Sequence, residues 1–203
     1  MEMRTLRAAA TQFETREDAG GELHISGYFA VFNSVYEIGP GMSESIAPGA
    51  FKNTLGGDIR ALTNHDTTLV LGRTTAGTLT LTEDDHGLWC DITINPKDGD
   101  AVNTRARVLR GDVTQCSIGF DIIREDTDVR PDGSTHWTIR EVRLWEVSVC
   151  TFPAYTETNI SARAADRDAA KARALEAWKN RMKTRLKGVL HHGAESPDAQ
   201  EKN

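Results

Sequence analysis

The sequence predicts a mainly β protein with helices, an α+β chain built on an antiparallel sheet that closes fully or in part. Three observations lead to this class. Short segments of alternating apolar and polar residues, rich in β-branched side chains, follow one another over residues 23–154. Turn-forming sequences separate these segments. Helical patterns are few, with two inside this region and a longer one after it.

The expected strands lie in six segments: LHISGYFAVF, TLVLGRT, TLTLTED, GLWCDITI, TQCSIGFDIIRE and HWTIREVRLWEVSVCTF. Turn chemistry is clearest at residues 85–87, 96–99 and 131–133, where Asp or Pro is followed by Gly. The last of these turns lies between DIIREDTDV and STHWTIREV, and it predicts a β-hairpin.

Helical patterns occupy three places. Residues 49–55 are compatible with a short helix. Residues 100–111 predict a longer helix that ends at Gly111, because glycine readily adopts the left-handed conformation of a helix C-cap. Residues 164–190 carry apolar side chains at helical spacing among many basic ones, which predicts a basic amphipathic helix before a polar tail.

Composition limits the classes of function. The 203 residues suffice for one ordinary domain and a modest tail, and an apolar content of 38% provides for a core. The net charge is −6 and no Lys/Arg cluster lies in the first two thirds, which argues against nucleic acid as a partner. No segment approaches the roughly 20 apolar residues of a membrane span, and the start lacks a secretory signal. We therefore expect a cytosolic protein without membrane contact.

The three cysteines, Cys90, Cys116 and Cys150, are widely spaced in apolar, strand-like contexts. They lack the paired spacing of a metal site. They are expected to be buried free thiols, and neither a metal nor another cofactor is predicted.

Hydrolysis of a peptide by serine requires a hydroxyl, a neutral imidazole that takes its proton, a group that orients the imidazole, and donors for the oxyanion. His65 lies at the end of the strand-like IRALTN, where its ring could face a cleft. Ser117 follows the predicted helix and is two residues from Gly119, which permits close approach of the backbone. Taken singly, the histidine is compatible with an exposed loop and the serine with a structural role.

Several motifs occur together in one order. They are SIAPGAF at residues 45–51, NHD at 64–66, LG at 71–72, SIGF at 117–120, EVSV at 146–149 and TFPA at 151–154. In content and order this set resembles the prohead serine protease family of tailed phages, over residues 25–159. The resemblance implies a fold like that of the herpesvirus assemblins, with a β-barrel core surrounded by helices. By motif it implies His65 as the catalytic histidine and Ser117 as the nucleophile.

Glu146 is the expected third member. In its strand it shares a face with Val142 and Leu144, so it should be partly buried and in need of a cationic partner, which an imidazolium would supply. A salt bridge to Arg140 or Arg143 is the alternative. Asp66 is adjacent to His65, and on extended backbone its side chain would point to the opposite face.

The oxyanion donor stays open. Backbone N–H groups after residues 109–111 are candidates, and assemblins use an arginine through a water. Arg110 and Arg163 are candidate arginines for that role.

The resemblance further implies a serine endopeptidase of capsid maturation, located in the host cytoplasm within the assembling prohead. Its partners would be the major capsid protein, whose scaffolding portion it cleaves, and itself through autocleavage. A homodimer is suggested by analogy with the assemblins. The expected organisation is an N-terminal segment (1–22), a protease domain (23–160) and a helical extension with a tail (161–203).

Two other functions stay open. The chain could be a catalytically silent factor that binds capsid or scaffold, or a different cytosolic hydrolase on a similar barrel. For the C-terminal helix, the readings are a partner-binding helix, a membrane-surface helix or a solvated helix packed along one edge.

Overall fold

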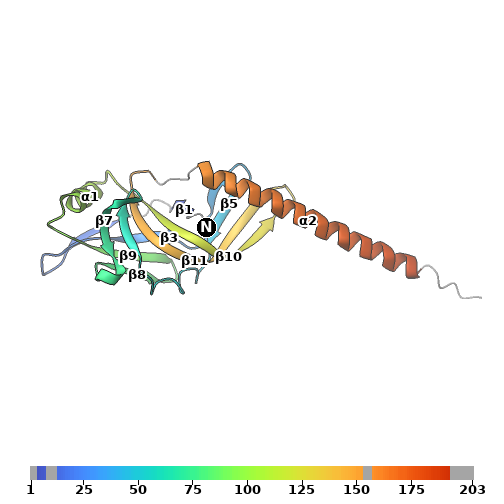
Figure 1. Ribbon diagram of the computed structural model, residues 1–203, viewed down its shortest axis with the longest axis horizontal. Helices are drawn as coiled ribbons and strands as arrows, with labels where there is room; N and C mark the ends of the chain where they lie inside the picture. Colours follow the sequence, from blue (N-terminus) through green and yellow to red (C-terminus); the bar gives the residue numbers. More distant parts are fainter. Residues whose placement is uncertain (1–3, 8–12, 153–156, 193–203) are drawn as a thin grey trace, which may run out of the picture.

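The computed structural model describes residues 4–7, 13–152 and 157–192. Its strands form two sheets that face each other, with helix α1 at one end and the long helix α2 at the other (Figure 1). The seven-stranded sheet contains β1 (Arg4–Arg7), β4 (Tyr36–Gly39), β5 (Met42–Ile46), β6 (Arg60–Thr63), β7 (Asp66–Arg73), β10 (Gln115–Val129) and β11 (Thr135–Cys150). The four-stranded sheet contains β2 (Glu14–Glu17), β3 (Leu23–Val31), β8 (Leu79–Glu83) and β9 (Gly87–Ile94).

Strand β11 organises the larger sheet. On one side it pairs with β10 in antiparallel fashion along nearly its whole length. On the other side it pairs in parallel first with β5 and then with β6. The sheet is therefore mixed, and the described strands form two open sheets, not the closed or half-closed antiparallel barrel expected. Alternation along the chain reports which residues face inward, but it does not report which strands become neighbours.

The core lies between the two sheets. Its fully buried members come from both of them and include Ile25, Phe29, Ile92, Ile118 and Val147. Each buried Ile, Val or Phe side chain contributes about 1.5–3 kcal/mol relative to an exposed position, so this layer fixes the two sheets against each other. The α+β class predicted from the sequence, mostly sheet with helices, is confirmed.

The two predictions about local structure that depend on glycine are confirmed. Helix α1 (Gly99–Arg110) begins after Asp98, whose carboxylate accepts from the N–H groups of Asp100 and Ala101. It ends at Gly111, which has a φ of 85°. The hairpin between β10 and β11 turns at residues 130–134, where Gly133 has a φ of 84°.

The short helix expected at residues 49–55 does not form. Successive turns occupy this stretch, with hydrogen bonds such as Lys52 N–H to Gly49 O and Thr54 N–H to Phe51 O. The burial of Phe51 and Ala50 in the core explains the apolar pattern that suggested a helix.

The N-terminal residues contribute a strand to each sheet. Strand β1 pairs with β10, and β2 pairs with β3. The division of the chain at residues 22 and 160 stays a prediction.

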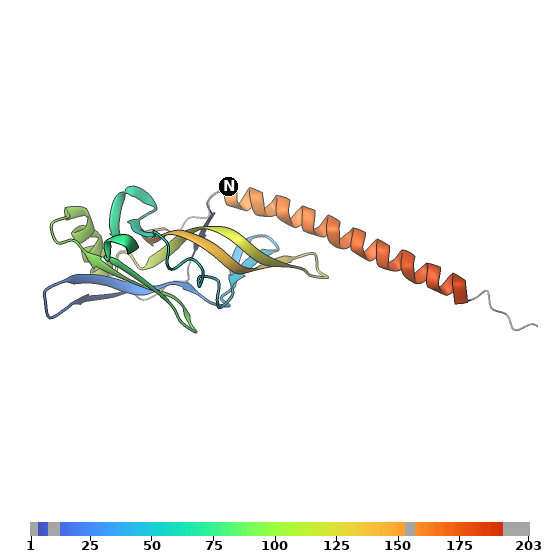
Figure 2. The same ribbon diagram turned by 60° about the horizontal axis from the view of Figure 1, so that its bottom comes forward.

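Helix α2 (Glu157–His192) packs on the sheet only at its beginning. Arg163, which is 3% exposed, donates to Glu125 of β10 and to Glu44 of β5. Its guanidinium lies 4.7 Å from the centre of the Trp137 ring. Beyond Ala170 the helix extends away from the strands, as two views show (Figures 1 and 2). Within the described part of the chain, no helix is long and apolar enough to cross a bilayer.

Candidate active site

His65 lies in the two-residue turn that joins β6 to β7. Asn64 and His65 have φ values of 54° and 60°, so both adopt the left-handed conformation that non-glycine residues avoid. Such a conformation costs about 1–3 kcal/mol per residue and persists when surrounding contacts enforce it.

Hydrogen bonds to the end of β11 hold this turn. Asn64 N–H donates to Val149 O over 2.9 Å, and Thr151 N–H donates to the Asn64 side-chain oxygen over 2.9 Å. His65 N–H donates to the Ser148 hydroxyl over 3.2 Å. The histidine is thus fixed through its backbone to the strand that carries Glu146.

A β-bulge in β11 turns Glu146 away from the core. In the β10–β11 register, Gly119 is paired with Glu146 and Phe120 with Leu144, so Trp145 is the extra residue. As a result, Leu144 and Val147 both lie in the core cluster. The expectation that Glu146 shares a face with Val142 and Leu144 is wrong, because an uninterrupted alternation does not exist here. Glu146 is nevertheless buried, with 4% exposed, on the other side of the sheet.

The carboxylate of Glu146 contacts the His65 ring. Oε1 lies 2.7 Å from Nδ1 of His65, whose side chain is 19% exposed. Oε2 accepts a hydrogen bond of 2.5 Å from the Ser148 hydroxyl. The other ring nitrogen, Nε2, is buried and has no hydrogen-bond partner among the described residues. With Nδ1–H donating to the glutamate, Nε2 of the neutral ring carries the lone pair that a general base uses.

The surroundings raise the pKa of His65. Burial alone lowers this pKa, but the side chain of Cys150 beside the ring, together with the hydrogen bond and negative charge of Glu146, outweighs burial. Together they raise the pKa from 6.5 to about 10. The resting ring is therefore an imidazolium at neutral pH.

Ser117 lies in β10 directly across from Ser148 of β11. It is fully buried, and its neighbours Cys116 and Ile118 point into the core. Two residues on, Gly119 pairs with Glu146. A Cβ atom at Gly119 would lie 3.0 Å from Glu146 Cδ, so only glycine leaves room for this carboxylate.

The structure thus brings two of the three predicted site residues into direct contact. His65 and Glu146 touch, and Ser117 is the cross-strand neighbour of the serine that binds both of them. A hydrogen bond between Ser117 and His65 Nε2 is not made. Catalytic hydrogen bonds are often long in proteins without substrate and shorten when substrate binds.

The competing partners proposed for Glu146 are engaged elsewhere. Arg140 donates to Asp126, and Arg143 lies over the ring of Trp145. The Asp66 carboxylate accepts from the Thr68 N–H and hydroxyl. The extended backbone predicted at His65 and Asp66 is wrong, because His65 is left-handed; the Asp66 side chain nevertheless turns to Thr68 and away from the ring of His65.

Both candidate arginines for the oxyanion are paired with carboxylates. Arg110 is exposed and pairs with Asp112. Arg163 is enclosed by Glu44, Glu125 and Trp137, which lie toward the opposite end of β10 and β11 from Ser117. The sequence does not predict either pairing. The partners of Arg163 are distant in the chain, and a pair such as Arg110 and Asp112 is common on protein surfaces.

All three cysteines are buried free thiols, as predicted. One group of possible metal ligands occurs among the described residues, formed by Asp18, Glu22 and His24. Nδ1 of His24 lies 3.2 Å from the Arg16 guanidinium, which is always a donor. The same nitrogen lies 3.3 Å from a carboxylate oxygen of Asp91, so the ring is already engaged by two charged side chains.

A cavity of about 640 Å³ lies between β7, the end of β9 and the β2–β3 turn. It is lined by residues that include Glu22, Val70, Arg73 and Asn95. None of His65, Ser117 and Glu146 lines it, so it is separate from the candidate site.

The site thus contains a histidine, a buried glutamate bonded to it, and a serine on the neighbouring strand. These are the side chains that a serine hydrolase uses. Comparison with known proteins identifies the class more closely. The chain belongs to the family of caudovirus prohead serine proteases, whose model matches residues 11–173.

Two individual proteins are similar to the chain. The chain is 32% identical over 164 residues to the prohead protease of Enterobacteria phage HK97. This match covers 79% of the chain and 68% of the phage HK97 protein. Among solved structures, the capsid assembly protease gp21 of bacteriophage T4 matches 74% of this chain and 99% of its own, with 10% identity and a TM-score of 0.47.

The chain is therefore a serine peptidase of phage capsid maturation, and the family resemblance read from its motifs is confirmed.

Proposed function

We propose that this chain cleaves the scaffolding portion of the major capsid protein, and then itself, with Ser117, His65 and Glu146 as its catalytic residues. The contact between His65 Nδ1 and Glu146 Oε1 is the observation that carries the assignment, because it holds the ring in the tautomer that a general base requires. Ser117 is assigned by its motif and by its place across from Ser148.

The reaction begins when substrate brings the Ser117 hydroxyl to His65 Nε2. The ring takes the serine proton as the oxygen attacks the scissile carbonyl, and it then gives that proton to the leaving amine. Water releases the acyl group by the same route. Glu146 stabilises the imidazolium formed in each step. Because the resting ring has a raised pKa, it must first lose its proton, and the rate rises with pH.

Ser117→Ala tests the assignment. Co-expressed with the capsid protein of its phage, this variant should assemble particles whose capsid protein is uncleaved, because no nucleophile is left. The control is Ser43→Ala, which removes a buried hydroxyl outside the site, where it is bonded to the ring of His136. Cleavage that persists in the Ser117 variant would show that the serine mechanism is wrong. A silent assembly factor would give uncleaved particles with the wild-type chain as well.

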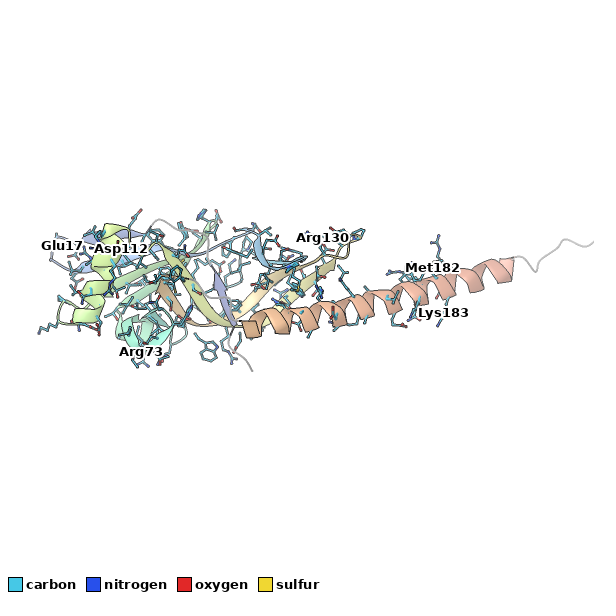
Figure 3. The ribbon with its side chains drawn as sticks, turned by 90° about the horizontal axis from the view of Figure 1, so that it is seen from above. Glu17, Arg73, Asp112, Arg130, Met182 and Lys183 are labelled. Atoms are coloured by element: carbon cyan, nitrogen blue, oxygen red, sulfur yellow. The ribbon has the colours of Figure 1, made fainter. Side chains whose placement is uncertain are left out.

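As part of the same proposal, the projecting part of helix α2 binds the scaffolding portion of the capsid protein. Beyond Ala170 it carries three large apolar side chains at positions i, i+3 and i+7, namely Leu175, Trp178 and Met182, which are 51%, 53% and 38% exposed. Figure 3 shows Met182 and Lys183 on the projecting part of α2, far from Glu17 and Asp112. Lys and Arg outnumber Asp and Glu in this helix, so an acidic amphipathic helix of the scaffolding portion fits it.

The test separates docking from catalysis. In a Ser117→Ala background, which prevents autocleavage, removal of residues 171–203 leaves the Arg163 contacts intact and should abolish incorporation into proheads. Trp178→Glu should reduce incorporation, whereas Leu109→Glu, at an exposed apolar position of α1, should not. The readout is the amount of protease in purified proheads. Normal incorporation of the truncated chain would contradict this role.

A further inference from the structure

We infer that Ser148 is a positioning residue of the active site, which fixes the geometry of the His65–Glu146 pair through its buried hydroxyl. This inference rests on the proposed function of that pair. Ser148 is fully buried and lies two residues after Glu146, on the same face of β11.

The Ser148 hydroxyl closes a ring of hydrogen bonds. His65 N–H donates to Ser148 Oγ, and the Ser148 hydroxyl donates to Glu146 Oε2. The other carboxylate oxygen, Oε1, is bonded to His65 Nδ1. One serine therefore fixes the backbone of the strained turn and the free oxygen of the carboxylate at the same time. Without it, Oε2 would be a buried oxygen lacking this donor, and the carboxylate could rotate.

The same hydroxyl should act on the pKa of His65. A hydrogen bond to a carboxylate is stronger when the negative charge is not compensated nearby. Glu146 is uncompensated when His65 is neutral and compensated when His65 is an imidazolium. Ser148 therefore stabilises the neutral-ring state more, which lowers the pKa of His65 from the value that it would otherwise have.

The location of Ser148 makes this role specific to the reaction. It is the cross-strand neighbour of Ser117, so the nucleophile and the positioning serine lie side by side on β10 and β11. The thiol of the next residue on this face, Cys150, interacts with the His65 ring and donates to Ser148 O over 3.7 Å. Of the groups described on this face, the Ser148 hydroxyl is the one bonded to both His65 and Glu146.

The experiment measures how fast a fluorophosphonate probe labels Ser117 in the full chain as a function of pH. Ser148→Ala should label about 10- to 100-fold more slowly at pH 7. The midpoint of its acid limb should move to higher pH by about half a unit or more. The difference in labelling rate between the variant and the wild-type chain should therefore become smaller as pH rises. Ser148→Thr, which keeps the hydroxyl, should have the wild-type midpoint.

The controls separate positioning from stability. Ser43→Ala removes a comparable buried hydroxyl outside the site, and it should leave the midpoint unchanged. A Ser148→Ala variant that unfolds at a lower temperature but keeps the wild-type midpoint and labelling rate would overturn the inference. Labelling that persists in Ser117→Ala would instead contradict the proposed function, so the two failures are distinguishable.

Discussion

At the scale of single residues, the position of Glu146 depends on the lack of a side chain at Gly119. The carboxyl group of Glu146 lies over it, in the space where any other residue would place its Cβ atom. The SIGF motif therefore has a physical reason for its glycine: without it, Glu146 could not lie flat against β10 and reach His65.

Gly119→Ala should accordingly impair activity and stability together. The added methyl group must displace Glu146, and overpacking of this kind costs about 1–3 kcal/mol. Fluorophosphonate labelling and the midpoint of thermal unfolding measure the two effects. Gly99→Ala is the control, because a Cβ there meets nothing within 4 Å and should be tolerated. A fully active Gly119→Ala chain would show that Glu146 does not need its present position.

His65 is the residue whose charge state governs the rate. Since its pKa is raised to about 10, labelling of Ser117 should increase from pH 6.5 upward, with an acid limb well above the usual histidine range. Glu146→Gln removes the negative charge, so the imidazolium loses its partner while burial still disfavours it. The acid limb should then shift to lower pH.

The same Glu146→Gln change should lower the maximal rate, by about 10²- to 10⁴-fold, because an amide does not enforce the required tautomer. The measurement is the pH profile of labelling for both chains. An unchanged acid limb would indicate that Glu146 is not the partner that raises the pKa of His65.

At the scale of elements, β11 carries most of the site because of its bulge. Before the bulge, Val142 and Leu144 face the core, and after it Val147 and Val149 do so. The bulge therefore lets one strand place Glu146 and Ser148 on the outer face without interrupting the core. The β6–β7 turn then folds onto that face, held by its hydrogen bonds to β11.

The attachment of α2 is a second property of elements. Arg163→Met should destabilise the chain by about 3–5 kcal/mol, because it leaves the carboxylate of Glu44, which is 5% exposed, buried without its cation. Lys179→Met on the same helix removes a cation that is paired with Glu176 at the surface, and it should cost about 0–1 kcal/mol. Urea unfolding measures both. Equal effects of the two substitutions would show that Arg163 does not anchor the helix.

At the scale of the whole molecule, the charge of His65 couples the site to folding. Its pKa is about 10 in the folded chain and near 6.5 when exposed, so the folded state holds an extra proton between these values. The stabilisation from this group is fully present below pH 6.5 and is lost as pH rises toward 10. The free energy of unfolding should therefore decrease over this window.

Urea unfolding between pH 6.5 and 9.5 tests this coupling. The decrease should be smaller in His65→Gln, which does not titrate, than in the wild-type chain. Identical pH dependence in the two chains would contradict the raised pKa. The consequence for the enzyme is that conditions favouring the catalytic base also weaken the fold.

The sequence by itself determined the features that neighbouring residues control. The α+β class, the cap of α1 at Gly111, the β10–β11 hairpin and the buried cysteines all follow from local periodicity and turn chemistry, which depend on backbone sterics within a few residues. The order of the motifs predicts the family and, through it, the roles of His65 and Ser117.

Only the tertiary structure decided which residues meet. The bulge at Trp145, the left-handed turn at Asn64 and His65, the enclosure of Arg163 and the place of Ser148 between His65 and Glu146 all depend on strands that are distant in sequence. Each is stabilised by hydrogen bonds or burial that form after the sheets assemble. A pattern within one segment therefore contains no record of them, because their free energy belongs to the pairing and not to the segment.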